Sequence, residues 1–107
     1  MPETHKTRRE MLEGFLAANP NDAFARYGLA IECGNQGDFD AAVSNFKQLI
    51  AAHPDYVTGY FQFAQLLARI SRNDEARQVL QQGMEAAHRA GNSHARDEME
   101  EFLRSLD

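Results

Sequence analysis

The stretch "GDFDAAVSNF", residues 37–46, contains the features that decide the fold. Gly37 can adopt the left-handed conformation that ends a helix, and Asp38 can accept backbone N–H bonds at the start of the next one. Ala42 then stands where a larger apolar side chain would bury more surface, and Phe46 follows one turn later. A methyl group in that place predicts that another helix crosses closely at Ala42, because a larger side chain would push the two axes apart.

The same pattern returns 34 residues later along the chain. Two of the three prolines, Pro20 and Pro54, stand in the similar surroundings "FLAANPND" and "LIAAHPDY". A shift of the sequence by 34 positions also aligns apolar and small residues with their like: Tyr27 with Phe61, Leu29 with Phe63, Ala30 with Ala64, Ala42 with Ala76, Phe46 with Leu80, and Leu12 with Phe46. A fixed period of this length indicates an internal structural repeat.

The apolar residues between the turns recur at spacings of three and four, which is the helical period. No stretch shows sustained alternation of apolar and polar residues, and no Asn-Gly or Asp-Gly hairpin is present. We therefore predict an all-α protein in which short joints make consecutive helices antiparallel. The predicted helices cover residues 5–18, 22–35, 39–52, 56–70, 74–89 and 93–105.

The period and the small residues resemble the tetratricopeptide repeat (TPR) family, in a small protein of the bacterial type, whose unit is a pair of antiparallel helices. The signature positions are held by Leu29, Ala30, Gly37, Ala42, Phe46 and Pro54 in the first repeat, and by Tyr60, Phe63, Ala64, Ala76 and Leu80 in the second. The sequence departs from the signature at Arg26, Cys33, Leu67, Ser71 and His88. The resemblance implies antiparallel helical hairpins that stack as a short right-handed α-solenoid.

This reading gives a single TPR-like domain over residues 1–107. It consists of a leading helix (5–18), a first repeat (23–56), a second repeat (57–90) and a capping helix (93–105). In the leading helix, Leu12, Phe15 and Leu16 are in phase with Phe46, Leu49 and Ile50, so this helix resembles the second helix of an incomplete repeat. The last helix has apolar residues on one face and acids on the rest, as a cap that ends a stack requires.

Composition excludes several classes of function. A net charge of −5 argues against nucleic-acid binding, because neutralising phosphates requires a basic face. No apolar run is long enough to span a bilayer, and the N-terminal residues lack the apolar stretch of a secretory signal, so we expect no membrane partner and a cytoplasmic location. Met1 and the capping helix lead us to expect a complete protein.

The sequence shows no catalytic, cofactor or metal site. Its single cysteine, Cys33, cannot form an internal disulfide and is interpreted as a small packing residue. The histidines are scattered, and the metal-like spacing of Glu85 and His88 occurs once, whereas carboxylate-bridged metal sites need two such motifs. We expect no cofactor and no enzyme activity.

The resemblance places function on the concave surface, which the first helix of each pair lines. The groove residues that it implies are Phe24, Tyr27, Ile31, Asn35, Thr58, Phe61, Gln62, Gln65 and Arg69. They favour a non-enzymatic module that binds a peptide or helix of a partner protein, unless neighbouring helices cover the aromatic rings. The alternative is a homo-oligomer in which the basic leading helix (Lys6, Arg8, Arg9) meets the acidic last helix (Asp97, Glu98, Glu100, Glu101).

Overall fold

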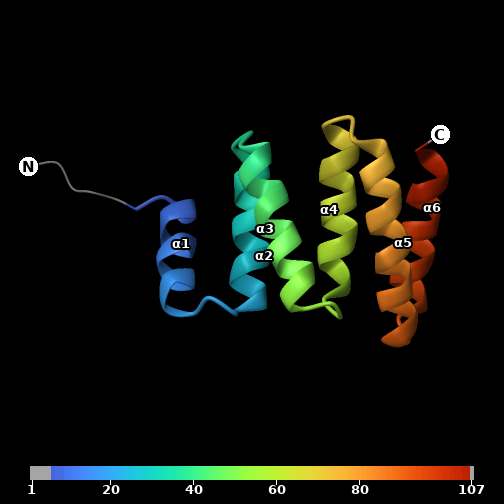
Figure 1. The fold of residues 1–107 in the computed structure, drawn as a ribbon, viewed down its shortest axis with the longest axis horizontal. Coiled ribbons are helices and arrows are strands. Elements are labelled where there is room, and N and C mark those ends of the chain that lie inside the picture. The colour runs from blue at the N-terminus through green and yellow to red at the C-terminus, as the bar shows by residue number, and fades with distance from the viewer. Residues whose placement is uncertain (1–5, 107) are drawn as a thin grey trace, which may run out of the picture.

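The computed structural model describes residues 6–106, and these form six α-helices and no strand. The helices are α1 (Arg8–Ala18), α2 (Ala23–Asn35), α3 (Phe39–Ala52), α4 (Val57–Arg69), α5 (Asn73–Arg89) and α6 (Ser93–Ser105). They follow one another along an elongated body of 54 × 28 × 19 Å, with α1 at the left end and α6 at the right end of Figure 1. The predicted all-α class and the stacked helical hairpins are confirmed.

The helix ends agree with the sequence prediction to within about two residues, apart from the start of α1. Residue 5, where the leading helix was predicted to begin, lies outside the described residues. Helix α1 begins at Arg8 because Thr7 and Glu10 form a capping box, in which each side chain bonds the backbone N–H of the other residue. Asp38 caps α3 as predicted, through a bond from the N–H of Ala41.

The alanines that recur with the 34-residue period lie where helices cross. Ala30, Ala42, Ala64 and Ala76 are all fully buried. At the first crossing, Gly34 of α2 packs so closely that a Cβ on it would lie 3.9 Å from the Cβ of Ala42. The small residues therefore let the axes approach, as the sequence predicted.

Larger side chains join one helix pair to the next. The rings of Phe46 in α3 and Phe63 in α4 stack with their centroids 5.3 Å apart and are 1% and 2% exposed. At the far end, Met99 and Leu106 bury the apolar face of α6 against the preceding helices. One continuous core thus runs along the row of helices.

The leading helix α1 is less covered than its counterpart α3. Leu16 is buried, but Leu12 is only half-buried and Phe15 remains 48% exposed. Leu49, which is in phase with Phe15, is fully buried. The difference arises because none of the described residues covers the side of α1 that corresponds to the buried side of α3.

Candidate functional site

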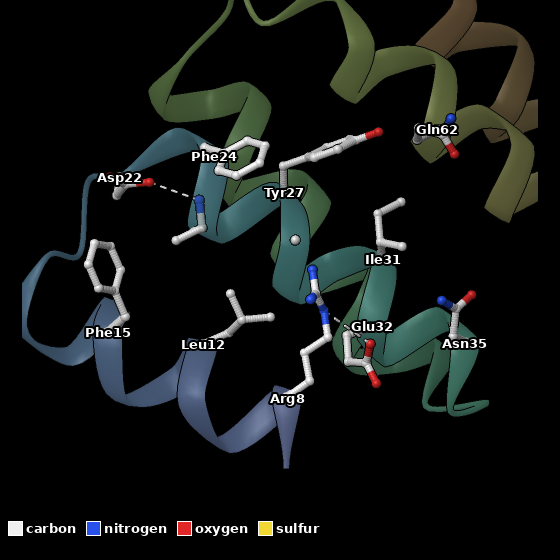
Figure 2. A pocket seen from close by; sticks show the side chains of 12 residues that line it. Arg8, Leu12, Phe15, Asp22, Phe24, Tyr27, Ile31, Glu32, Asn35 and Gln62 are labelled. Atoms are coloured by element: carbon white, nitrogen blue, oxygen red, sulfur yellow. Dashed lines mark hydrogen bonds and ion pairs between the residues drawn. The ribbon is translucent and has the colours of Figure 1, made fainter. Parts of the chain in front are cut away.

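Helices α2 and α4 present their side chains to two neighbouring hollows. The larger hollow has a volume of about 680 Å³ and lies between α1 and α2, with Gln62 of α4 at its edge (Figure 2). The smaller one, about 160 Å³, lies between α2 and α4. Ile31, Asn35 and Gln62 line both hollows and so connect them.

The predicted groove residues of α2 all line the larger hollow. Phe24 is 77% exposed and Asn35 is exposed, whereas Tyr27 and Ile31 are half-buried. The Tyr27 ring packs against the ring of Tyr56, with centroids 5.5 Å apart, and burial raises the pKa of the Tyr27 hydroxyl. Tyr27 and Ile31 thus offer apolar surface that is held in place by the fold but not covered by it.

The predicted residues of α4 divide into two groups. Gln62, Gln65 and Arg69 line the smaller hollow, and the Arg69 guanidinium lies over the Phe39 ring, 5.4 Å from its centroid. The other two, Thr58 and Phe61, line neither hollow; Thr58 is exposed.

The half-buried Phe61 ring is used within the chain itself. It packs edge-on against Phe102 of α6, with centroids 5.9 Å apart. Tyr27 is therefore a better candidate contact than Phe61.

Sequence reasoning missed the contribution of α1 to this site. Arg8, Leu12 and Phe15 form the wall of the larger hollow that faces α2 (Figure 2). Arg8 Nε lies 3.6 Å from Glu32 Oε1, and its side chain is 69% exposed. A signal was present, because Arg8 stands 34 residues before Ala42 and cannot form the same close crossing.

Arg9, one member of the basic cluster, is engaged within the chain. Arg9 Nη1 lies 2.9 Å from Asp38 Oδ2, and Arg9 Nε lies 3.3 Å from Glu13 Oε2. The Arg9 guanidinium and the N–H of Ala41 lower the pKa of Asp38. Arg9 therefore ties α1 to the start of α3.

The described residues hold no group of three or more His, Cys, Asp or Glu side chains arranged to bind a metal ion. Cys33 is fully buried, as its interpretation as a packing residue required, and burial raises the pKa of its thiol. Among the helices of residues 6–106, none has the length and apolar character needed to cross a membrane.

Comparisons with known proteins agree with this architecture. Residues 35–95 match the family model described as tetratricopeptide repeat. A TPR repeat-containing protein of Pseudomonas aeruginosa is 31% identical over 98 residues, covering 92% of this chain and 93% of its own length.

Two solved structures are also similar. The solution structure of a tetratricopeptide repeat domain protein from Salinibacter ruber has a TM-score of 0.77 and 31% identity, over 82% of this chain and 89% of that one. A solution structure of a Bordetella parapertussis protein has a TM-score of 0.79 and 25% identity, over 95% of this chain and 89% of that one. The chain belongs to the tetratricopeptide repeat family.

Proposed function

We propose that the chain is a non-enzymatic interaction module that binds a peptide or helix of a partner protein in the groove lined by α2 and α4. The observation that carries the proposal is the pair of connected hollows, in which seven of the nine predicted groove residues take part. TPR domains generally bind protein partners, which agrees with this use of the surface.

The chemistry of the groove fits such a ligand. Tyr27 and Ile31 supply apolar surface at its centre, while Gln62, Gln65 and Arg69 supply hydrogen-bond donors and acceptors along one side. Aromatic and arginine side chains dominate the binding energy of most protein interfaces. A ligand with an apolar anchor and polar backbone or side-chain groups would satisfy both parts.

A matched pair of isoleucines tests the proposal. Ile31 lines the groove, whereas Ile50 is equally half-buried but lines a different depression beside α5. We expect Ile31→Asn to reduce capture of partner proteins from a lysate of the source cells, while Ile50→Asn retains it, with circular dichroism showing that both variants fold. Loss of the same proteins in both variants, or in neither, would contradict the proposal.

Self-association through the terminal helices has weaker support. The acids of α6 are largely exposed, but Arg9 is paired with Asp38 and Glu13, and Arg8 lies beside Glu32. Light scattering at low and high salt separates the two functions. A monomer at both salt concentrations leaves the groove as the interaction surface, whereas a dimer that dissociates in salt would favour assembly through the ends.

A further inference from the structure

The larger hollow has a counterpart inside the fold, and helix α2 fills that counterpart. Gly34 of α2 packs against Ala42 of α3 and Leu66 of α4: a Cβ on Gly34 would lie 3.9 Å from the Ala42 Cβ and 3.5 Å from Leu66 Cδ1. Arg26 of the same helix donates a hydrogen bond of 3.0 Å to Asn45 of α3. Helix α2 thus lies against the surfaces of α3 and α4.

The residues 34 positions before Ala42 and Leu66 hold the corresponding places on α1 and α2, but no helix among residues 6–106 covers them. Arg8 corresponds to Ala42 and Glu32 to Leu66, and both line the larger hollow. Ala42 is fully buried and Leu66 is 6% exposed, whereas the side chains of Arg8 and Glu32 are 69% and 22% exposed. Within residues 6–106, α1 and α2 therefore form a helix-binding surface like that of α3 and α4, and it is uncovered.

The apolar part of this surface includes two exposed aromatic side chains. Phe15, which is 48% exposed, and Phe24, which is 77% exposed, both line the larger hollow. Leu12 lines it too and packs close to Gly28, where a Cβ would lie 3.6 Å from Leu12 Cδ2. Large apolar side chains gathered on one exposed patch are typical of an interaction surface.

Two features specify the chemistry of the occupant. Arg8 and Glu32, 3.6 Å apart, replace the apolar pair Ala42 and Leu66, so a ligand helix must place a polar group beside them. An Asn or Gln side chain can accept from Arg8 and donate to Glu32 at once. A helix antiparallel to α1 would also bring its C-terminal carbonyls, which carry partial negative charge, toward Arg8 and the exposed Lys6.

We propose that this surface binds an amphipathic helix of a partner protein, which lies against α1 and α2 as α2 lies against α3 and α4. The inference rests on the proposed function and assigns the class of ligand. The ligand helix carries apolar residues toward Leu12, Phe15 and Phe24, and an amide side chain toward the Arg8–Glu32 pair. A second copy of α6 fits poorly, because its apolar Met99 and Leu106 are buried in its own chain.

A peptide with the sequence of α2 is a defined probe for this surface. The probe spans residues 22–36 and carries Cys33→Ser to prevent oxidation and Gly34→Asn to meet the Arg8–Glu32 pair. A control peptide carries Gly34→Leu instead and leaves that pair without a polar partner. Titration of the full, isotope-labelled chain with each peptide, followed by amide chemical shifts, locates the binding and measures its affinity.

We expect the probe to shift the amide signals of α1 and of the adjoining face of α2. Its affinity should exceed that of the control peptide by about tenfold or more. Phe15→Ser should weaken binding of the probe by about tenfold. Gln48→Ala, at an exposed position of α3 that lines neither hollow, should change the affinity by less than about twofold. Absence of saturable binding, or equal affinity for the Phe15 variant, would overturn the inference. Shifts confined to Gln65 and Arg69 would overturn it while leaving the groove proposal in place.

Discussion

Gly83 of α5 lies so close to Tyr60 of α4 that a Cβ on the glycine would be 2.6 Å from the Tyr60 Cβ. The same atom would lie 2.6 Å from the sulfur of Met99. Two helices therefore converge on a position in α5 that has no side chain, and this position fixes how α4, α5 and α6 pack together.

Replacement of Gly83 by alanine should destabilise the fold despite the better helix propensity of alanine. The added methyl group must displace Tyr60 or Met99, and overpacking of this kind costs about 1–3 kcal/mol. Gly14 is the matched control, since it lies in α1 with no atom within 4 Å of a Cβ, so Gly14→Ala should stabilise by about 0.5–1 kcal/mol. Urea denaturation of both variants checks the pair, and a stable Gly83→Ala protein would refute the packing.

Replacement of Ala42 by leucine tests the helix crossing that the sequence predicted. Because Ala42 is fully buried beside Gly34, the larger side chain should separate α2 from α3 and lower the melting temperature. The cost should be about 1–3 kcal/mol. Ala52→Leu, at an exposed position, serves as the control; equal melting temperatures for the two variants would show that the crossing is not tight.

Ser71 adopts a φ of 65°, in the left-handed region that Gly37 occupies 34 residues earlier with a φ of 81°. A residue with a Cβ is strained there, so Ser71→Gly should relieve strain and raise the free energy of unfolding by up to about 1 kcal/mol. Gly37→Ala should have the opposite effect, for the same reason. Thermal denaturation of both variants and of the unmodified chain checks this. Ser71→Gly melting below the unmodified chain would contradict the account.

Stability should fall in acid partly through Asp38. Its folded-state pKa is lowered by the hydrogen bond from Arg9, so the stabilisation is present above the unfolded pKa, about 4, and is lost as the pH falls through the lower folded value. Asp38→Asn removes this titration and should flatten the acid limb of a plot of stability against pH. An unchanged pH dependence in the variant would show that the Arg9–Asp38 pair contributes nothing.

The sequence predicted most of the fold because its decisive features are local or periodic. Gly37 and Asp38 mark a helix end and a helix start wherever they occur, and the spacing of Ala42 and Ala76 reveals the close crossings. The packing at Gly83 could not be predicted in this way. The residue in phase with it, Leu49, is large and packs against Gly59, so the 34-residue pattern does not indicate that position 83 must be small.

The candidate site was predictable only in part. The resemblance indicated which face of α2 and α4 to examine, and Tyr27, Ile31 and Gln62 do line the hollows there. It could not show that Phe61 is engaged by Phe102, because that contact joins helices whose separation depends on the whole stack. The part played by Phe15 depends on what covers α1, and the periodicity of the chain does not contain that information.

The measurement that tests the central claim most directly is photo-crosslinking from a single position in the full chain. A photoreactive residue at Gln62, which lines both hollows, should crosslink to a partner protein in the source cells, whereas the same residue at the exposed Gln48 of α3 should not. Ile31→Asn should abolish the crosslink from Gln62. The same crosslinked species from both positions, or none from Gln62, would contradict the account of the groove as the partner-binding surface.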